Sequence, residues 1–191
     1  MAKKESSFTN MLLTLLIVTA ISSLAASGVY NLTKGPIAEV KRLKQERAIK
    51  QVMPGFTELE RMAALPPKGG DSLVLFKGLE NGSDIGVAVN TYTNMGYSGL
   101  IKMMVGFQAD GTINNFEVLE HKETPGLGTK MTEPAFKEQF QGKNPANFNL
   151  KVKKDGGDVD AITAATITSR AVCDAIQRAY DTYEEMNPDN K

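Results

Sequence analysis

The chain has little of the residue types on which many enzyme active sites depend. Its 191 residues include one cysteine, one histidine and no tryptophan. A single cysteine excludes an intramolecular disulfide framework and a thiolate-rich metal site, and a single histidine excludes a multi-histidine metal cluster. Cys173 falls on the apolar side of an expected helix, which predicts a buried and inert thiol. Chemistry here must therefore come from hydroxyls, carboxylates, glycines and backbone groups, or from a cofactor.

An excess of charge of either sign is also missing. Lysine plus arginine and aspartate plus glutamate both count 22, so the formal net charge is zero. Proteins that bind nucleic acids are usually strongly basic, and nothing in this balance points to such a partner. The length allows one domain of ordinary size plus an appendage.

The appendage is an uncharged N-terminal stretch. No charged residue occurs between Ser6 and Thr33, and Met11–Tyr30 is a mostly apolar run of twenty. At about 1.5 Å per residue this run is roughly 30 Å long, which matches the core of one bilayer. A cleaved signal peptide is the competing interpretation, with small residues near Ala25 as the cleavage site, but the length of the run favours a retained anchor. Basic residues stand on both sides of the run, so the charges leave its orientation open.

A second helix is expected to begin at Pro36, because proline fits the first turn of a helix. One face of this amphipathic stretch is apolar, and we expect it to pack on a core: Ile37, Val40, Leu43, Ile49 and Val52. The sequence Met53-Pro54-Gly55 should end it. The predicted organisation is thus an anchor segment, a connecting amphipathic helix and a folded domain, at residues 1–34, 35–55 and 56–191.

The remaining pattern predicts an α+β domain. Four segments with strand periodicity are separated by short turns, which is typical of an antiparallel meander: Ser72–Leu79, Asp84–Tyr92, Leu100–Phe107 and Thr112–Leu119. Such a sheet needs helices on one face, and two are available at Glu133–Gln141 and Ser169–Met186. The polar tail Asn187–Lys191 is expected to fray.

The stretch "DAITAATITS", Asp160–Ser169, places four hydroxyl residues at the entrance of the last helix: Thr163, Thr166, Thr168 and Ser169. Hydroxyl side chains can cap the free N–H groups of a first turn, and one would be enough. Four of them, with the small Ala164 and Ala165 between, also suit a phosphate-binding helix terminus. The spacing alone leaves both interpretations open.

Two loops carry further candidates. "GYSG" at Gly96–Gly99 would let the backbone approach a flat ligand, although most such loops are only turns. "HKETPGLGTKM" at His121–Met131 places Leu127 at its tip between glycines. A structural loop explains the glycines through positive φ, whereas a ligand-facing loop also explains the apolar tip. The sequence does not decide between these interpretations.

The N-terminal span, "GYSG", "HKETPGLG" and "DAITAATITS" occur together, in order, over almost the whole chain. In this combination the chain resembles the FMN-binding subunit family of bacterial respiratory complexes. The G subunits of the Rnf-type ion-translocating electron-transport complexes are the nearer match, and the C subunits of the sodium-pumping NADH:quinone oxidoreductases are the relatives that stand as the alternative. The resemblance implies an α+β FMN-binding domain behind a transmembrane helix.

The resemblance also implies a covalent cofactor. In that family a Ser/Thr-Gly-Ala-Thr element carries FMN through a phosphodiester bond to its last threonine, which corresponds to Thr166. Ala164 stands where the family usually has glycine, and its methyl group could strain a positive φ. A free threonine hydroxyl is a weak nucleophile, so loading is assigned to a separate flavin transferase that uses FAD and a divalent cation. The resemblance implies further cofactor contacts at Thr163, Ala164, Ala165, Thr168, Ser169, His121, Glu123, Thr124, Leu127, Gly128, Tyr97 and Ser98.

The expected function is that of a membrane-anchored electron carrier, not a catalyst by itself, in an Rnf-type ferredoxin:NAD oxidoreductase. Its expected partners are the other membrane subunits, membrane lipid and the flavin transferase. The resemblance places the domain on the outer face of the bacterial cytoplasmic membrane. A pilin-like structural protein would share the architecture, but pilins need a glutamate shortly inside the apolar run, and Met11–Tyr30 contains no acid.

Overall fold

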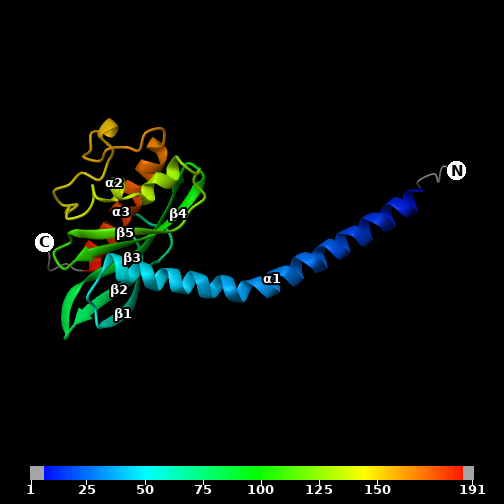
Figure 1. Cartoon of the computed structure of the whole chain (residues 1–191), viewed down its shortest axis with the longest axis horizontal. Helices are drawn as coiled ribbons and strands as arrows, with labels where there is room; N and C mark the ends of the chain where they lie inside the picture. The colour runs from blue at the N-terminus through cyan, green and yellow to red at the C-terminus, as the bar shows by residue number, and fades with distance from the viewer. Residues whose placement is uncertain (1–6, 187–191) are drawn as a thin grey trace. The chain divides into compact units, whose positions relative to one another are not determined.

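The structure is a computed structural model that describes residues 7–186. The chain forms two compact units, which divide between Leu43 and Lys44. The second unit contains an antiparallel sheet and the helices packed on it (Figure 1). The α+β architecture expected from the sequence is confirmed. The tail that was expected to fray lies outside the described residues.

Helix α1 is one continuous element, Phe8–Val52, with Pro36 inside it. The prediction that a separate helix begins at Pro36 is therefore wrong. Proline removes the hydrogen bond to the carbonyl four residues earlier. That carbonyl belongs to Leu32, which is exposed, so solvent can replace the lost partner. The predicted end of the amphipathic stretch at Met53 is confirmed.

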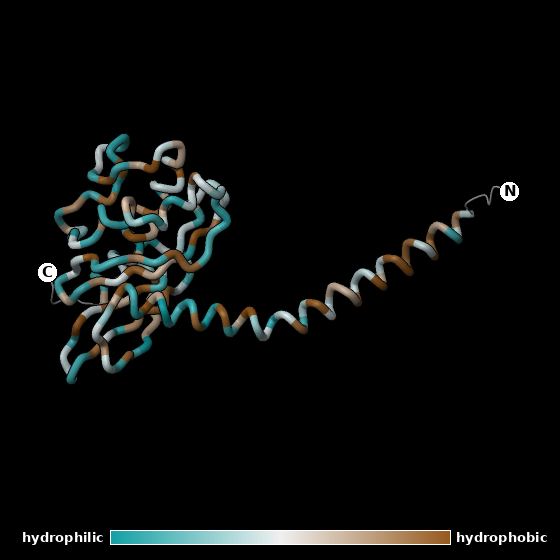
Figure 2. The backbone as a smooth tube through the Cα atoms, in the orientation of Figure 1, coloured by the Kyte–Doolittle hydropathy of each residue, from teal (hydrophilic) through white to brown (hydrophobic). Residues whose placement is uncertain are grey.

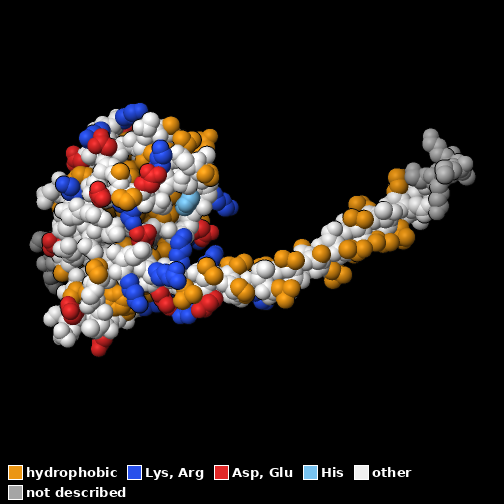
Figure 3. All heavy atoms as spheres, in the orientation of Figure 1, with side chains coloured by type: hydrophobic (Ala, Val, Ile, Leu, Met, Phe, Trp, Pro, Cys, Tyr) orange, Lys and Arg blue, Asp and Glu red, His pale blue; other side chains and the backbone are white. Residues whose placement is uncertain are grey.

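The N-terminal part of α1 is long and apolar enough to cross a membrane, judged by length and composition. Figure 2 shows the hydrophobic residues along this part of the helix, and Figure 3 shows apolar side chains over its surface without charged ones. Three of its hydroxyl residues, Thr14, Thr19 and Thr33, each donate to a carbonyl of the preceding turn. These bonds satisfy their polar groups inside an apolar segment.

The sheet has five antiparallel strands in sequence order, β1 to β5. Their bounds are Glu58–Ala64, Leu73–Glu80, Ser83–Gly96, Gly99–Gln108 and Ile113–Glu120. The last four match the predicted strands, and the third continues four residues beyond the predicted end at Tyr92. The first was missed because "ELERMAA" is an almost fully exposed edge strand without apolar alternation.

Both faces of the central strands are covered, and alternate residues of each strand serve different cores. On one face Leu75, Val89 and Val105 join the larger core under helix α3. On the other face the neighbouring residues of these strands pack against the last two turns of α1: Phe76, Ala88 and Met104 against Ala48, Ile49 and Val52. The part of the amphipathic stretch nearest the domain therefore packs on a core as expected, whereas Ile37 and Val40 are exposed.

Helix α3, Thr166–Met186, starts three residues earlier than predicted and provides most of the helical cover of the larger core. The other predicted helix is reduced to one turn, α2 at Pro134–Lys137, which follows the short 3₁₀ helix η1 at Gly128–Thr132. A second 3₁₀ turn, η2, occupies Lys153–Asp155. Cys173 on α3 is buried, and burial raises the pKa of its thiol to about 12. The predicted burial of this thiol is confirmed.

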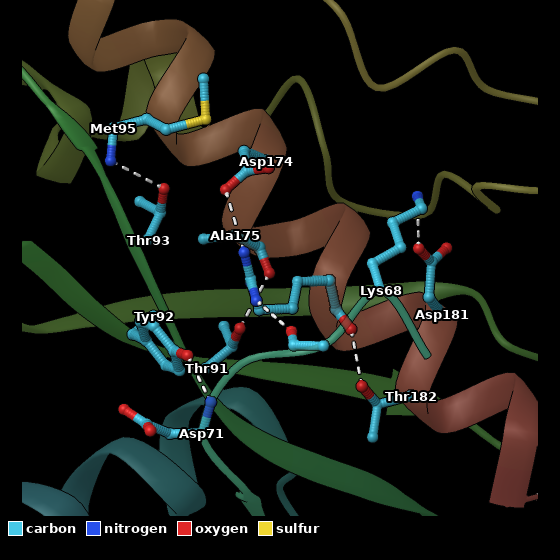
Figure 4. A network of polar contacts seen from close by, with 12 residues as sticks. Lys68, Asp71, Thr91, Tyr92, Thr93, Met95, Asp174, Ala175, Asp181 and Thr182 are labelled. Atoms are coloured by element: carbon cyan, nitrogen blue, oxygen red, sulfur yellow. Dashed lines mark hydrogen bonds and ion pairs between the residues drawn. The ribbon is translucent and has the colours of Figure 1, made fainter. Parts of the chain in front are cut away.

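A polar network fixes the β3 strand and the loop before β2 to helix α3 (Figure 4). The Thr91 hydroxyl donates to the Ala175 carbonyl, and Lys68 forms an ion pair with Asp181. The Tyr92 hydroxyl accepts from the backbone N–H of Asp71, and the Arg178 guanidinium lies 5.1 Å from the centre of the Tyr92 ring. These contacts hold β3 against the helix up to the hairpin that follows it.

Candidate functional site

A cavity of about 560 Å³ opens at the N-terminus of helix α3. Its walls come from three parts of the chain that are distant in sequence: the β3–β4 hairpin turn, the loop after β5, and the start of α3. The lining residues are Tyr97, Glu123, Thr124, Leu127, Gly128, Ala164, Ala165, Thr166, Ile167 and Thr168. The size and the mixed apolar and polar lining are typical of a small-molecule site.

The four hydroxyl residues of the "DAITAATITS" stretch divide into two pairs. Thr168 and Ser169 are buried and hydrogen-bonded within the protein. Thr163 and Thr166 are more exposed, and among the described residues their hydroxyls have no hydrogen-bond partner. Thr166 alone of this second pair lines the cavity. The stretch therefore presents one free hydroxyl to the cavity.

Ser169 explains the structural part of the motif. Its Oγ accepts from the backbone N–H of Ile162 at 2.9 Å and donates to the carbonyl of Ala165 at 3.0 Å. The N–H of Ala165 in turn donates to the Ile162 carbonyl at 2.9 Å. One hydroxyl thus fixes the turn that leads into the helix, which leaves the other residues of the motif free for other roles.

The first turn of α3 supplies free donors. The first intrahelical bond runs from the N–H of Ser169 to the carbonyl of Ala165. Among the described residues, the backbone N–H groups of Thr166, Ile167 and Thr168 have no acceptor, as is usual for a helix start. Free N–H groups and the positive end of the helix dipole favour an anion, and a phosphate is the anion best matched to several donors.

Ala164 has a backbone φ of +62°, in the left-handed region that favours glycine. It is one of two non-glycine residues with positive φ in the described chain; the other is Asn81. The strain expected from alanine at this position of the motif is therefore present. The turn keeps its shape because Ser169 fixes the residues on either side of it.

The loop after β5 contributes both polar and apolar groups to the cavity. Leu127 lies at its tip and remains 42% exposed, and the N–H of Leu127 closes a turn by donating to the Thr124 carbonyl. Gly126 has a φ of +75°, and its N–H donates to the Thr129 hydroxyl. This geometry accounts for glycine at 126, whereas Leu127 lines the cavity and belongs to neither of the described core clusters.

Glu123 is the acidic residue of the cavity wall, and it is only 5% exposed. Its Oε1 accepts from the backbone N–H of Ser98 at 2.9 Å, and its Oε2 accepts from the Thr168 hydroxyl at 2.6 Å. The carboxylate thus joins the "GYSG" turn, the "HKETPGLG" loop and the start of α3.

Nine of the thirteen predicted site residues line the cavity, and four do not. Ser98 donates its backbone N–H to Glu123, and the Nδ1 atom of His121 accepts from the Glu123 N–H at 3.2 Å. Ser169 is fully buried, and Thr163 is exposed outside the lining. Ile167 lines the cavity and was missed. The sequence could have indicated it, because Ile167 is an apolar residue that does not lie on the core-facing side of α3.

The residues present fit a flavin mononucleotide by their chemistry. Free first-turn amides suit its phosphate, and the exposed apolar side chains of Tyr97, Leu127 and Ile167 suit a flat aromatic ring. A methyl group at Gly128 would lie 2.5 Å from Glu123 Oε2, so glycine at this position lets the backbone of the cavity wall lie close to the carboxylate.

Comparisons with known proteins agree with this site. Residues 96–181 match the FMN-binding domain family, a range that includes every residue of the cavity wall. The G subunit of the ion-translocating oxidoreductase complex of Methanosarcina acetivorans is 31% identical over 176 residues, covering 91% of this chain and 93% of the relative. The G subunit of the Na⁺-translocating ferredoxin:NAD⁺ oxidoreductase complex of Acetobacterium woodii is 29% identical and covers 92% and 91%.

The fold is also similar to a solved structure, NqrC of Shewanella oneidensis. The TM-score is 0.51 at 24% identity, over 67% of this chain and 68% of that one. At this identity the likeness concerns the fold alone. The sequence relatives carry the assignment, because they match almost from end to end. The chain belongs to the family of G subunits of ion-translocating oxidoreductase complexes.

Proposed function

We propose that the protein is a membrane-anchored flavoprotein that carries electrons within an Rnf-type ion-translocating ferredoxin:NAD oxidoreductase complex. Relatives that match over about nine-tenths of the chain bear the names of subunits of such complexes. The FMN-binding domain and the N-terminal apolar helix support the same role. The chain is a carrier whose partners are the other subunits of the complex, and it is not a catalyst by itself.

FMN occupies the cavity at the start of α3, attached through its phosphate to Thr166. The observation that carries this proposal is the free Thr166 hydroxyl, because Thr166 lines the cavity and stands beside unpaired first-turn N–H groups. Thr168 and Ser169 are already engaged in internal hydrogen bonds. Thr163 is exposed, and it does not line the cavity.

Attachment is a group transfer that needs a separate flavin transferase. The Thr166 oxygen forms a new P–O bond to the FMN phosphorus of FAD, the P–O–P bond of FAD breaks, and AMP leaves. The hydroxyl proton passes to a base of the transferase, because none of the residues that line the cavity is described as a partner of this hydroxyl. The phosphodiester keeps one negative charge, which the helix N-terminus favours.

Once bound, FMN supplies one-electron and two-electron transfer, and the protein supplies position and environment. The amides of Thr166 to Thr168 hold the phosphate. Leu127 and Ile167 offer apolar contact to the ring, and Tyr97 lies on the same rim. A covalent tether suits this role, because a carrier that turns over repeatedly keeps its cofactor.

Peptide mass spectrometry tests the attachment. Trypsin should release residues 155–170 as one peptide, since no lysine or arginine lies between Lys154 and Arg170. After coexpression with the transferase this peptide should carry one FMN, and fragmentation should place it on Thr166. Thr166→Ala should abolish the modification, and the matched Thr163→Ala variant should retain it. Flavin that survives denaturation of Thr166→Ala would refute the assignment.

The domain faces the outer side of the cytoplasmic membrane, with α1 as a retained single span. A reporter enzyme that is active only outside the cytoplasm, fused after Lys191, tests this topology. The expected result is an active fusion in the membrane fraction at the full-length mass. An intact but inactive fusion would contradict the orientation, and a shortened soluble fusion would contradict the retained anchor.

A further inference from the structure

One buried carboxylate holds the three walls of the cavity together. Glu123 stands in the loop after β5, and each of its two side-chain oxygens accepts a hydrogen bond from a different segment. The partners are 25 residues earlier, at the Ser98 N–H of the hairpin turn, and 45 residues later, at the Thr168 hydroxyl of helix α3. The hairpin, the loop and the helix start therefore meet at a single side chain.

The packing around Glu123 is close enough to make this junction specific. A methyl group at Gly96 would lie 2.8 Å from Oε1, and one at Gly128 would lie 2.5 Å from Oε2 and 2.9 Å from the Thr168 hydroxyl oxygen. Contacts this short require the surroundings to shift. Glycine at both positions therefore lets the hairpin and the loop approach the carboxylate from two sides.

The hairpin turn has little else to hold it at the site. Its residues Tyr97 and Ser98 are exposed, and Tyr97 is 70% exposed although it lines the cavity. Farther back the hairpin strand is held by other contacts, where Thr91 bonds to α3 and the Thr93 hydroxyl accepts from the Met95 N–H. The bond from Ser98 to Glu123 is the described hydrogen bond that links the turn itself to the cavity wall.

We propose that Glu123 is a positioning residue for the cofactor. By accepting from Ser98 and Thr168 it sets the distance between the hairpin turn, the loop that carries Leu127, and the first turn of α3. This role rests on the proposed function: the junction would keep the side chains that face the flavin ring at a fixed position relative to the attachment residue. The junction itself exists without any ligand, so it can be tested in flavin-free protein.

Two substitutions separate the hydrogen bonds from the mere presence of a side chain. Glu123→Ala removes both acceptors. Glu123→Gln keeps both bonds, because the amide oxygen can accept from Ser98 while the amide NH₂ donates to the Thr168 hydroxyl, which can also act as an acceptor. Glu138→Ala is the matched control, since Glu138 is an exposed glutamate of the same chain.

The first experiment measures amide hydrogen exchange in the full-length chain in detergent, expressed without the transferase. Glu123→Ala should speed exchange at least tenfold in a peptide covering residues 92–101, with β4 residues 103–107 unchanged. Glu123→Gln and Glu138→Ala should stay within twofold of wild type. Unchanged exchange in Glu123→Ala, or acceleration in folded Glu123→Gln equal to that of Glu123→Ala, would overturn the proposal. If Glu123→Ala does not fold, Thr168→Val removes one of the two bonds and should give a smaller acceleration of the same peptide.

The second experiment follows the cofactor in loaded protein by flavin fluorescence anisotropy. With the walls in register the tethered ring should tumble with the protein, so the anisotropy is high. Glu123→Ala should lower it by at least half, and Glu123→Gln should restore it. Equal anisotropy in folded, loaded Glu123→Ala and wild type would overturn the positioning role. Failure of FMN attachment in every chain, wild type included, would contradict the proposed function and leave the exchange result to decide on the junction.

Discussion

Replacing Ala164 by glycine should stabilise the folded domain, although the change removes a methyl group. Ala164 has a φ of +62°, and it is exposed at the cavity wall, so its methyl group is not part of a packed core. An L-residue in the left-handed region brings Cβ too close to the following carbonyl oxygen, and glycine has no Cβ. The folded state of Ala164→Gly therefore loses strain and little packing.

The magnitude follows from two opposing effects. Left-handed backbone costs a non-glycine residue about 1–2 kcal/mol. Glycine makes the unfolded chain more flexible, and this lowers stability by about 0.4–1 kcal/mol. The difference leaves a net gain of about 0.5–1 kcal/mol. For a domain of this size such a gain corresponds to a rise in melting temperature of about 2 °C.

The assay is thermal and denaturant unfolding of flavin-free, full-length protein, followed by circular dichroism. Ala146→Gly is the matched control, because Ala146 is also exposed and lies outside the left-handed region. This control should lose about 0.5 kcal/mol through the entropy of the unfolded chain. Ala164→Gly that is less stable than wild type, or destabilised to the same degree as the control, would refute the strain argument.

Three further predictions address the cavity, the sheet and the buried thiol. Leu127→Asp should lower the flavin midpoint potential by about 130 mV relative to Leu127→Asn, because charges about 5 Å apart at an effective dielectric of about 20 repel by about 3 kcal/mol, at about 2.3 kcal/mol per 100 mV. Equal potentials in fully loaded protein would mean that the loop lies away from the ring. Gly106→Ala should lower the free energy of unfolding by about 1–3 kcal/mol, because the added methyl group would overlap the Val52 carbonyl. In the control Gly35→Ala the methyl group meets open space, and the free energy of unfolding should not fall. Burial raises the pKa of the Cys173 thiol from 9.0 to about 12, so the thiolate fraction at pH 8 falls by roughly a thousandfold. Alkylation of Cys173 should therefore be at least a thousandfold slower in native than in denatured protein. Comparable alkylation rates in the two states would contradict the burial.

The sheet was predictable because its pattern is local. Four strands alternate or run apolar between clear turn signals, and their neighbours in sequence are their neighbours in the sheet. Strand β1 carries no such signal, since its residues are exposed and it is held by pairing with β2. The helix predicted at residues 133–141 is only the single turn α2 in the structure. Phe136 lies in that turn and Phe140 follows it, and both are buried in the larger core, while the chain beyond Lys137 continues as non-helical turns.

The junction between α1 and the sheet depends on contacts that sequence patterns do not specify. The sequence predicts a helix start at Pro36, because proline begins many helices. In the structure the helix continues to Val52, and its end is fixed by partners far away in sequence. Asn114 donates to the Val52 carbonyl at 2.8 Å, and Gly106 has no side chain to block that approach. Neither residue shows this role in its local pattern.

The hydroxyl motif shows the same limit at the functional site. Within seven residues the sequence offers four similar side chains, and both capping and phosphate binding remain open from their spacing. The structure separates them through distant or preceding partners: Glu123 engages Thr168 from 45 residues away, and the Ile162 N–H engages Ser169. With these two hydroxyls committed, the exposed position of Thr163 and the cavity-facing position of Thr166 distinguish the remaining pair. The proposed attachment at Thr166 thus rests on which hydroxyls the tertiary fold has already engaged, and this is why the free Thr166 hydroxyl is the informative observation.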